Sequence, residues 1–467
     1  MFFQFFHAGC TPIRRCFIGV ICLALIFAGG CAAPDAATKL RERLQTLPEF
    51  PAVTTRSIPY PIILLHGLGQ KADVWNESAV GYYKKELGLH FGGQLIAPNE
   101  KCSLKSSGDV MGDFFTVSFG NPADSVNGWV SQLERFIPIV LEKTKAKKVI
   151  IIGYSMGGLT ARTYLTRHLQ DHKTQRLITI GSPHQGSSFA KVWKWKTSVK
   201  SLIDGDANII TKTAVQPLLS IIEAAEQDVP FDSPAVRDLM RPQDGGKFIA
   251  ALNYAEHPLD VEYISVVGAV DMLREVKSLN SSAAQELFRR LLSVIGLGPE
   301  ALFEGGDGVV SASSQTINEI PWFKQNASRQ RISRTVTLGS VHTEHLRNSN
   351  EIQRITLEDK PEFKGAEFYA GYKGRPVLMI EFTDYLPPEL CEVSVLFREV
   401  SGNKRGITLP RGSARLIQKP DGSTTAAAFI EFPADLSFEQ NITAEFTVKN
   451  SFGNIFASLK QWTWKQE

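Results

Sequence analysis

The sequence predicts an α/β protein, in which a doubly wound, mostly parallel sheet with helices on both faces is followed by a smaller antiparallel β-sandwich. Two observations lead to this prediction. Through most of the chain, short apolar runs alternate with amphipathic helical stretches. From about residue 358, the pattern changes to short β-type runs separated by Gly, Pro, Asn and Asp. Strands that alternate with helices form parallel sheets, whereas evenly spaced strands with turn signals form sandwiches.

The predicted strands of the first part are continuous apolar runs, as strands buried on both faces of a sheet require. They are residues 61–65, 114–119, 149–152, 176–180, 261–267 and 334–338. Apolar side chains at spacings of three and four indicate a helix over residues 128–143, and residues 159–169 form a second helical stretch. Residues 187–250 and 271–304 are helix-like and lie between consecutive strands, so we expect them to be helical insertions.

The second part of the chain is expected to span residues 358–467 and the first part residues 58–357. The β-type runs of the second part are residues 377–382, 393–397, 426–432 and 443–448. They are short and bounded by turn-forming residues, which is typical of a small antiparallel sandwich.

The composition excludes several classes of protein. Of the 467 residues, 43% are hydrophobic and 21% are charged, as in an ordinary globular protein. Lys and Arg number 51 against 48 Asp and Glu, a formal net charge of +3. The chain therefore has no broad basic surface, and we do not expect it to bind nucleic acid. A mean hydropathy of −0.09 excludes a protein with many membrane spans.

The N-terminus has the features of a secretory signal. Two arginines precede an uncharged apolar run, residues 16–30, which is too short to span a hydrocarbon core of about 30 Å comfortably. The run ends in small residues before Cys31, which resembles a bacterial lipoprotein signal. We therefore expect residues 1–30 to be removed, Cys31 to carry lipid, and residues 31–57 to form a tether to the bacterial cell envelope. An ordinary cleaved signal or an uncleaved anchor is the alternative.

A Gly-x-Ser-x-Gly motif occupies residues 153–157. Such a motif is weak by itself, but this one directly follows the predicted strand 149–152 and directly precedes a helical stretch. A tight strand-turn-helix connection holds the serine in strained backbone angles and projects its hydroxyl from the carboxyl edge of the sheet. Ser155 is therefore the predicted nucleophile, and a buried structural turn is the alternative.

A serine hydroxyl needs a base to accept its proton, and the base needs a carboxylate to orient it. His342 and His345 follow the last predicted strand, which ends at the same sheet edge as the serine turn. We favour His342, which comes first out of the strand, and keep His345 as the alternative. Asp307 lies between glycines that suit a sharp loop and is the favoured carboxylate. Asp271, just after the strand 261–267, is its alternative.

The oxyanion of a tetrahedral intermediate needs backbone N–H donors. Met156, immediately after the nucleophile and at a helix N-terminus, is expected to supply one of them. The second is expected from Leu68, in the His-Gly-Leu-Gly loop after the first strand, where glycines allow the main chain to approach a substrate closely.

Five motifs in this order resemble the α/β-hydrolase superfamily, and within it the bacterial triacylglycerol lipases and inositol-deacylase-like esterases. They are HGLG (66–69), GYSMGG (153–158), GSPHQGS (181–187), GDGVV (306–310) and SVHTEHL (340–346). The resemblance covers about residues 58–357. It implies a triad of Ser155, Asp307 and His342 with Leu68 and Met156 as oxyanion donors.

The resemblance has three further implications. The GSPHQGS motif is a structural turn, so His184 is not catalytic. Related lipases often hold a calcium ion through an Asp soon after the catalytic histidine, but Arg347 and Asn348 stand here instead. We therefore expect no metal and no cofactor. The insertion 187–250 takes the place of a lid, and its residues 189–202 interleave apolar side chains with lysines, which suits a lipid–water interface. A cap helix packed on the core is the alternative.

The sequence therefore predicts a serine carboxylic-ester hydrolase, a lipase or esterase that works through an acyl-enzyme on acyl lipids. The membrane would be contacted through the lipid anchor and the lid. Two alternatives stay open. An acyltransferase would use the same triad with an alcohol in place of water, and a surface binding protein would work through the sandwich at residues 358–467.

Overall fold

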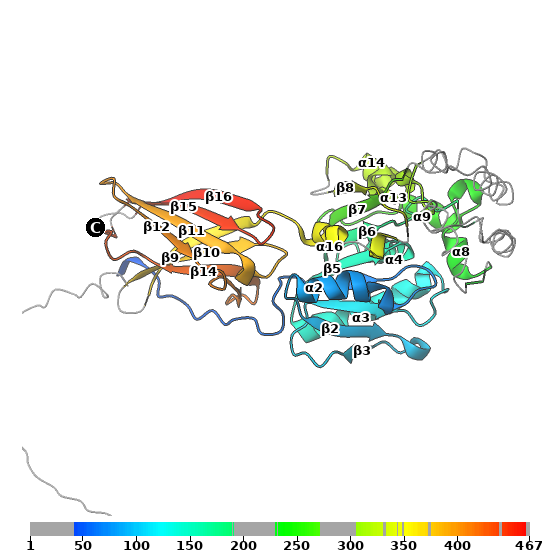
Figure 1. Ribbon diagram of the computed structural model, residues 1–467, viewed down its shortest axis with the longest axis horizontal. Helices are drawn as coiled ribbons and strands as arrows, with labels where there is room; N and C mark the ends of the chain where they lie inside the picture. The colour runs from blue at the N-terminus through cyan, green and yellow to red at the C-terminus, as the bar shows by residue number, and fades with distance from the viewer. Residues whose placement is uncertain are drawn as a thin grey trace, which may run out of the picture.

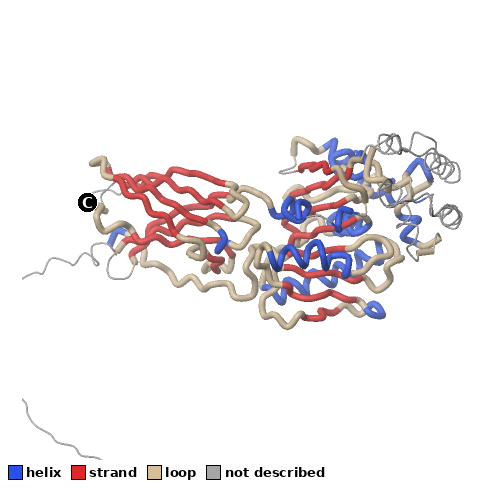
Figure 2. Tube along the Cα trace, viewed as in Figure 1, coloured by secondary structure: helices blue, strands red, loops and turns tan. Residues whose placement is uncertain are grey.

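A computed structural model of the chain shows two packed parts, a mixed α/β part and a β-sandwich (Figures 1 and 2). It describes residues 42–188, 190, 229–230, 232–270, 305–329, 333–342, 344–347, 350–371, 375–438 and 441–463. Several predictions lie outside the described residues. They concern the signal with Cys31, the insertion 271–304 with Asp271, and most of the insertion 187–250, including its apolar and lysine-rich segment.

The α/β part is built on an eight-stranded sheet with the strand order β3-β2-β4-β1-β5-β6-β7-β8. Its strands are β1 (Ile62–Leu65), β2 (Phe91–Ile96), β3 (Ser103–Ser106), β4 (Phe114–Ser118), β5 (Val149–Tyr154), β6 (Thr174–Ile180), β7 (Glu262–Gly268) and β8 (Ser333–Leu338). All neighbours are parallel except the antiparallel pair β2 and β3. The predicted mostly parallel sheet is confirmed. The edge strand β3 and its neighbour β2 were not predicted from the sequence, since they carry serine and lysine, and glycine and glutamine, respectively.

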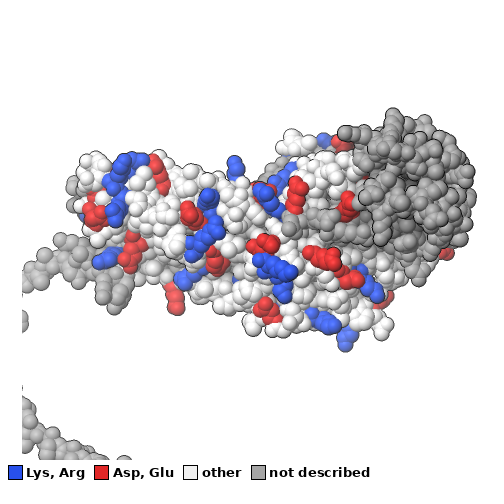
Figure 3. All heavy atoms as spheres, in the orientation of Figure 1, with Lys and Arg blue, Asp and Glu red and all other residues white. Residues whose placement is uncertain are grey.

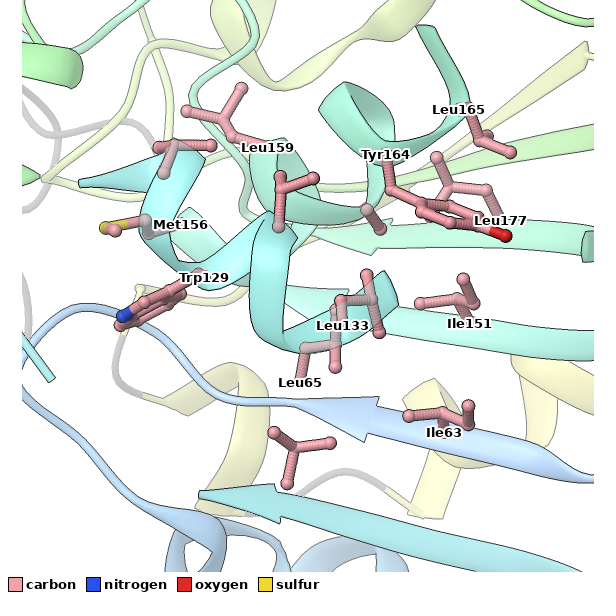
Figure 4. Close-up of a cluster of buried hydrophobic side chains, with 14 of the residues drawn as sticks. Ile63, Leu65, Trp129, Leu133, Ile151, Met156, Leu159, Tyr164, Leu165 and Leu177 are labelled. Carbon is pink, nitrogen blue, oxygen red and sulfur yellow. The ribbon is translucent and has the colours of Figure 1, made fainter. Parts of the chain in front are cut away.

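Helices cover both faces of this sheet (Figure 1). On one face, α3 (Val126–Thr144) packs against α4 (Met156–Arg167), and the apolar stripe of α3 is buried against β1 and β5 (Figure 4). The other face is covered by η1 (Ala72–Trp75), η2 (Asn76–Val80), α2 (Gly81–Lys85), α15 (Glu344–Arg347) and α16 (Asn350–Leu357). The two layers bury the central strands on both sides, which explains their continuous apolar sequence.

Shorter helical elements complete the α/β part, and one more lies in the sandwich. They are η3 (Pro98–Glu100), α8 (Pro234–Asp238), η5 (Pro242–Asp244), α9 (Lys247–Tyr254), α13 (Ala312–Gln315), η6 (Ile317–Glu319), α14 (Pro321–Gln325) and, in the sandwich, η8 (Pro388–Leu390). Among the described residues, no helix is both long enough and apolar enough to cross a bilayer.

The second part is a sandwich of two four-stranded antiparallel sheets, ordered β13-β14-β10-β9 and β12-β11-β15-β16. The strands are β9 (Glu362–Ala370), β10 (Pro376–Thr383), β11 (Glu392–Glu399), β12 (Lys404–Leu409), β13 (Arg415–Gln418), β14 (Thr424–Glu431), β15 (Asn441–Lys449) and β16 (Ile455–Thr463). The predicted sandwich is confirmed. The four predicted runs are β10, β11, β14 and β15, the central strands of the two sheets, and the four missed strands are the edges.

The sandwich packs against the amino ends of the parallel strands. Arg176, near the start of β6, is fully buried and forms ion pairs of 2.6 Å with Glu262 at the start of β7 and with Asp359, just before β9. Its guanidinium lies 3.6 Å from the ring centre of Tyr385, which follows β10 in the sandwich. The Tyr385 hydroxyl donates to Glu262 over 2.7 Å. The carboxyl ends of the strands, which carry the predicted site, therefore lie at the opposite edge.

Residues 42–57 correct the prediction of a tether, because they lie along the sandwich as a packed strap (Figure 1). The Leu47 amide donates over 3.1 Å to the last residue of β9, and the Val53 amide donates over 3.0 Å to a carbonyl of β13. Arg56 then donates over 2.6 Å to the carbonyl of the last residue of α3. Phe50 is buried against β10 and β14. Backbone hydrogen bonds and the buried Phe50 therefore hold the segment to the sandwich, and Arg56 connects its end to the α/β part.

Basic and acidic side chains of the described residues are interspersed on the face shown in Figure 3, in agreement with the nearly balanced composition.

Candidate active site

The serine turn joins β5 to α4 and contains the strained residue that the motif predicts. Ser155 has φ 52° and ψ −121°, in a region that residues other than glycine rarely adopt. A Cβ atom at Gly153 would lie 2.4 Å from the Gly158 nitrogen, and one at Gly157 would lie 2.6 Å from the His66 carbonyl oxygen. Only glycine fits at these two positions, so the motif's glycines are required by the close packing around the serine.

Three side chains from distant loops meet at this turn. The His342 ring presents Nε2 at 3.1 Å from Ser155 Oγ and Nδ1 at 2.7 Å from Asp307 Oδ2. An ionised carboxylate only accepts hydrogen bonds, so Nδ1 carries the proton and Nε2 is left free to accept from the serine hydroxyl. Of the two histidines that the sequence left open, His342 is the one that contacts the serine. Asp307 is fully buried, and its alternative, Asp271, lies outside the described residues.

The Asp307 carboxylate accepts hydrogen bonds at both oxygens. Its Oδ1 accepts from the amides of Val309 and Val310 over 3.0 and 2.8 Å, within a sharp turn flanked by glycines. Burial by itself raises the pKa of Asp307, but the neighbouring His342 and His345 and their hydrogen bonds outweigh it and hold the pKa well below its usual range. The group is therefore an anion at neutral pH.

His345 lies in α15 and is also fully buried. Its Nε2 is 3.2 Å from Asp307 Oδ2, the oxygen that His342 also contacts, and its Nδ1 is 2.9 Å from Ser340 Oγ. Within the described residues, no hydrogen bond joins His345 to Ser155. The sequence raised His345 as an alternative base and had no signal for its contact with the carboxylate.

The loop after β1 lies directly over the serine. A Cβ atom at Gly67 would come within 3.1 Å of the Ser155 Cβ, so Leu68 begins the segment beside the nucleophile. Among the described residues, the backbone N–H groups of Leu68 and Met156 donate to no acceptor. Met156 is the first residue of α4, where such groups have no partner within the helix. That these two N–H groups serve as oxyanion donors stays a prediction.

Two supporting residues were not recognised as such in the sequence. The Tyr154 hydroxyl donates to the His342 carbonyl over 2.9 Å, and the two rings lie 5.1 Å apart. His66 is fully buried, with Nδ1 2.8 Å from the Gly67 carbonyl and Nε2 accepting from the Phe119 amide over 3.3 Å. Burial lowers the pKa of His66 to about 4, so the ring is neutral at neutral pH. Each residue stands inside a motif, which is the only signal that the sequence offered for it.

The His184 side chain lies away from the serine, as the resemblance implies for a structural turn. It is fully buried with Nε2 3.1 Å from Thr179 Oγ1, and burial lowers its pKa well below the usual value.

Asp307, His342 and His345 form a group whose possible metal-ligand atoms all lie within 4.8 Å of one another. An ion bound there would have to replace the hydrogen bonds between the carboxylate and the two rings. The absence of a metal stays a prediction.

Comparisons with known proteins find similarity to thioesterases and lipases. The profile of the palmitoyl protein thioesterase family matches residues 61–221. A triacylglycerol lipase of Pseudarthrobacter phenanthrenivorans is 28% identical over 170 residues, which are 36% of this chain and 46% of the lipase. The chain is similar to α/β-hydrolases of the lipase and esterase type. The resemblance to lipases and esterases predicted from the motifs is thereby confirmed.

Two further similarities were found. A triacylglycerol lipase of Burkholderia plantarii is 28% identical over 170 residues, which are 36% of this chain and 40% of the lipase. The chain thus matches less than half the length of either curated lipase. A crystal structure of a Listeria innocua gene product covers 63% of this chain and 92% of its own, with a TM-score of 0.38 and 14% identity.

Proposed function

We propose that this α/β-hydrolase is a serine esterase or lipase that cleaves carboxylic esters through an acyl-enzyme. The observation that carries the proposal is the hydrogen-bonded series Ser155 Oγ, His342 and Asp307, with distances of 3.1 and 2.7 Å. Ser155 Oγ attacks the ester carbonyl carbon while His342 Nε2 takes the hydroxyl proton. Asp307 holds the histidine in the tautomer that accepts this proton and stabilises the imidazolium that results.

The oxyanion of the tetrahedral intermediate is held by the N–H groups of Leu68 and Met156. When the intermediate collapses, the bond to the alcohol oxygen breaks, and His342 returns its proton to the leaving alcohol. Water then attacks the acyl-enzyme with the same base and the same oxyanion donors. Its proton passes through His342 back to Ser155, and the carboxylic acid leaves.

The substrate proposed is an ester with an acyl chain. The relatives are named as triacylglycerol lipases, and the matching family profile is named for a palmitoyl thioesterase. The apolar and lysine-rich segment predicted at residues 189–202 suits a lid at a lipid–water interface.

Labelling with a fluorophosphonate probe tests the nucleophile. The wild type should be labelled, and Ser155→Ala should not. His342→Ala should lose at least about 10³-fold in labelling rate and in kcat/KM, because the serine then lacks its base. Ser131→Ala, on the exposed face of α3, serves as the matched control and should behave as the wild type. Labelling of Ser155→Ala at the wild-type rate would remove the proposal.

A chain-length series of aryl esters tests the substrate class. An increase of kcat/KM with acyl length supports a lipid substrate. A maximum at acetate or butyrate would leave an esterase of small esters and overturn the lipid assignment.

We further propose that the chain is anchored to the bacterial cell envelope by lipid on Cys31. The signal-like sequence before this cysteine supports the proposal. Radiolabelled palmitate supplied to bacteria expressing the full chain should enter the wild type and not Cys31→Ser, and only the wild type should sediment with membranes. Equal labelling of the two chains would refute the anchor.

A further inference from the structure

We propose that His345 is a positioning residue of the triad, which donates a second hydrogen bond to Asp307 and thereby sets the pH range in which His342 accepts the serine proton. The inference rests on the proposed function, since it concerns the working of the same triad. It assigns a role to a histidine that does not touch the nucleophile.

The two histidine rings meet one oxygen atom. Asp307 Oδ2 is 2.7 Å from Nδ1 of His342 and 3.2 Å from Nε2 of His345. A carboxylate has no proton to give, so His345 must carry its proton on Nε2. Its Nδ1 lies 2.9 Å from the Ser340 hydroxyl, which can donate to it in this tautomer. His345 is therefore oriented as a donor to the catalytic carboxylate.

The fold leaves a slot of defined shape for this ring. Gly268 ends β7, and a Cβ atom there would lie 2.5 Å from His345 Cε1. Gly181 follows β6, and a Cβ atom there would lie 3.0 Å from His345 Cδ2. Side chains at these two strand ends would displace the ring. His345 is fully buried, so its position is set by packing and not by solvent.

A second donor changes how strongly the carboxylate acts on His342. Two donors on one oxygen share its charge, so each is attracted less than a single donor would be. We therefore expect removal of His345 to strengthen the attraction of Asp307 for protonated His342. Among the described residues, the Tyr154 ring lies beside His342 and the Ser340 hydroxyl lies beside His345.

The carboxylate is also held in one orientation. Its Oδ1 accepts from the amides of Val309 and Val310, and its Oδ2 accepts from the two rings. Four donors leave the group no alternative rotamer of equal energy. Removal of His345 would take one hydrogen bond from Oδ2, and the Asp307 carboxylate would then be held less firmly in its orientation toward His342.

The test compares two variants that differ in the donor. His345→Met keeps a similar volume without an N–H, whereas His345→Gln places an amide N–H near the position of Nε2. The pH dependence of kcat/KM is measured for the full chain with a soluble aryl ester. We expect the midpoint of the acid limb to rise by about 0.5 to 1 pH unit in His345→Met, and the plateau of kcat/KM to fall about 10-fold. His345→Gln should restore both values toward the wild type.

His172→Met is the matched control. His172 is buried, and its Nε2 lies 2.8 Å from Asp260 Oδ1 near the start of β6, at the sheet edge opposite the serine. This variant removes a comparable histidine–carboxylate contact, so it should lower the melting temperature without moving the acid limb.

An unchanged acid limb in a folded His345→Met, or equal values for the Met and Gln variants, would overturn the positioning role. If His345→Met does not fold, Ser340→Ala keeps the ring and removes the hydrogen bond that holds its other nitrogen. A smaller shift in the same direction is then expected, and no shift contradicts the proposal. Failure of the proposed function looks different, because the wild type itself would then show neither hydrolysis nor labelling.

Discussion

Ser155 shows how one residue's conformation depends on its neighbours. Its positive φ costs on the order of 1 to 3 kcal/mol and persists only because the surrounding structure determines it. The flanking Gly153 and Gly157 allow α4 and the loop after β1 to approach within distances that no side chain would permit. The strained angles therefore follow from close packing of the turn, and they direct the hydroxyl toward His342.

His66, directly before the oxyanion loop, makes a prediction about pH. Burial lowers its pKa from the usual 6.5 to about 4. Between these two values the unfolded chain binds more protons than the folded chain, so the free energy of unfolding falls as the pH falls through this window. The contribution of His66 between pH 7.5 and pH 5.0 is about 2 kcal/mol.

Urea unfolding at these two pH values checks the prediction. His66→Asn should lose about 2 kcal/mol less stability than the wild type on going to pH 5.0. The pKa values of His184 and His257 are also lowered by burial, so part of the pH dependence should remain in the variant. An identical loss in the variant and the wild type would show that His66 is not the titrating group.

At the scale of elements, the position of a strand within the sandwich matched whether its sequence predicted it. In the sandwich, β10, β11, β14 and β15 are central and were predicted, whereas the four edge strands were not. An edge strand pairs on one side only and is partly exposed, so its sequence carries polar side chains and a weaker pattern. Long amphipathic helices such as α3 are easier to predict, because their buried apolar residues recur at spacings of three and four.

The start of α3 offers a test at this scale. Ser125 is its N-cap, and its Oγ accepts from the Gly128 amide over 3.0 Å. Ser125→Ala leaves this amide without its acceptor and should lower the free energy of unfolding by about 1 kcal/mol. Ser131→Ala, an exposed serine of the same helix, should change stability by less than about 0.5 kcal/mol in the same urea experiment. Equal effects would mean that the cap contributes nothing specific.

The whole molecule is organised by the junction between its two parts. Arg176 is buried there between Glu262 and Asp359 and under Tyr385. Arg176→Met removes the cation and leaves two carboxylates without it, so it should destabilise the protein by about 3 kcal/mol or more. Calorimetry should then show the α/β part and the sandwich melting separately. A single transition at the wild-type temperature would mean that the junction does not depend on this residue.

The first described residues, 42–47, lie at the end of the sandwich that is distant from the α/β part (Figure 1). The strap meets the end of β9 distant from the junction. The nine residues of β9 and the six of β5 together span about 50 Å along this axis. The eleven residues from Cys31 to Glu42 reach at most about 40 Å. With the proposed lipid on Cys31, we therefore expect the proposed catalytic edge to lie away from the membrane that holds the anchor.

Vesicles test this orientation with the lipidated full chain. The protein is anchored in one population of vesicles, and an ester lipid is present in these vesicles and in a second population without protein. The rate of hydrolysis per accessible lipid should be higher in the second population. An insertion of about 20 Gly and Ser residues after Cys31 should raise hydrolysis in its own vesicles and leave the rate on a soluble ester unchanged. Faster hydrolysis in its own vesicles without the insertion would contradict the orientation.

Local patterns in the sequence were sufficient for the buried strands, for helix α3 and for the serine turn, because each depends on neighbours a few positions away. Tertiary structure alone decided what depends on distant groups. It brought His342 into contact with the Ser155 hydroxyl and His345 into contact with the Asp307 carboxylate, although both histidines follow the same strand. It also turned the expected tether into a strap and buried Arg176 between two parts of the chain, because those contacts exist only after the chain has folded.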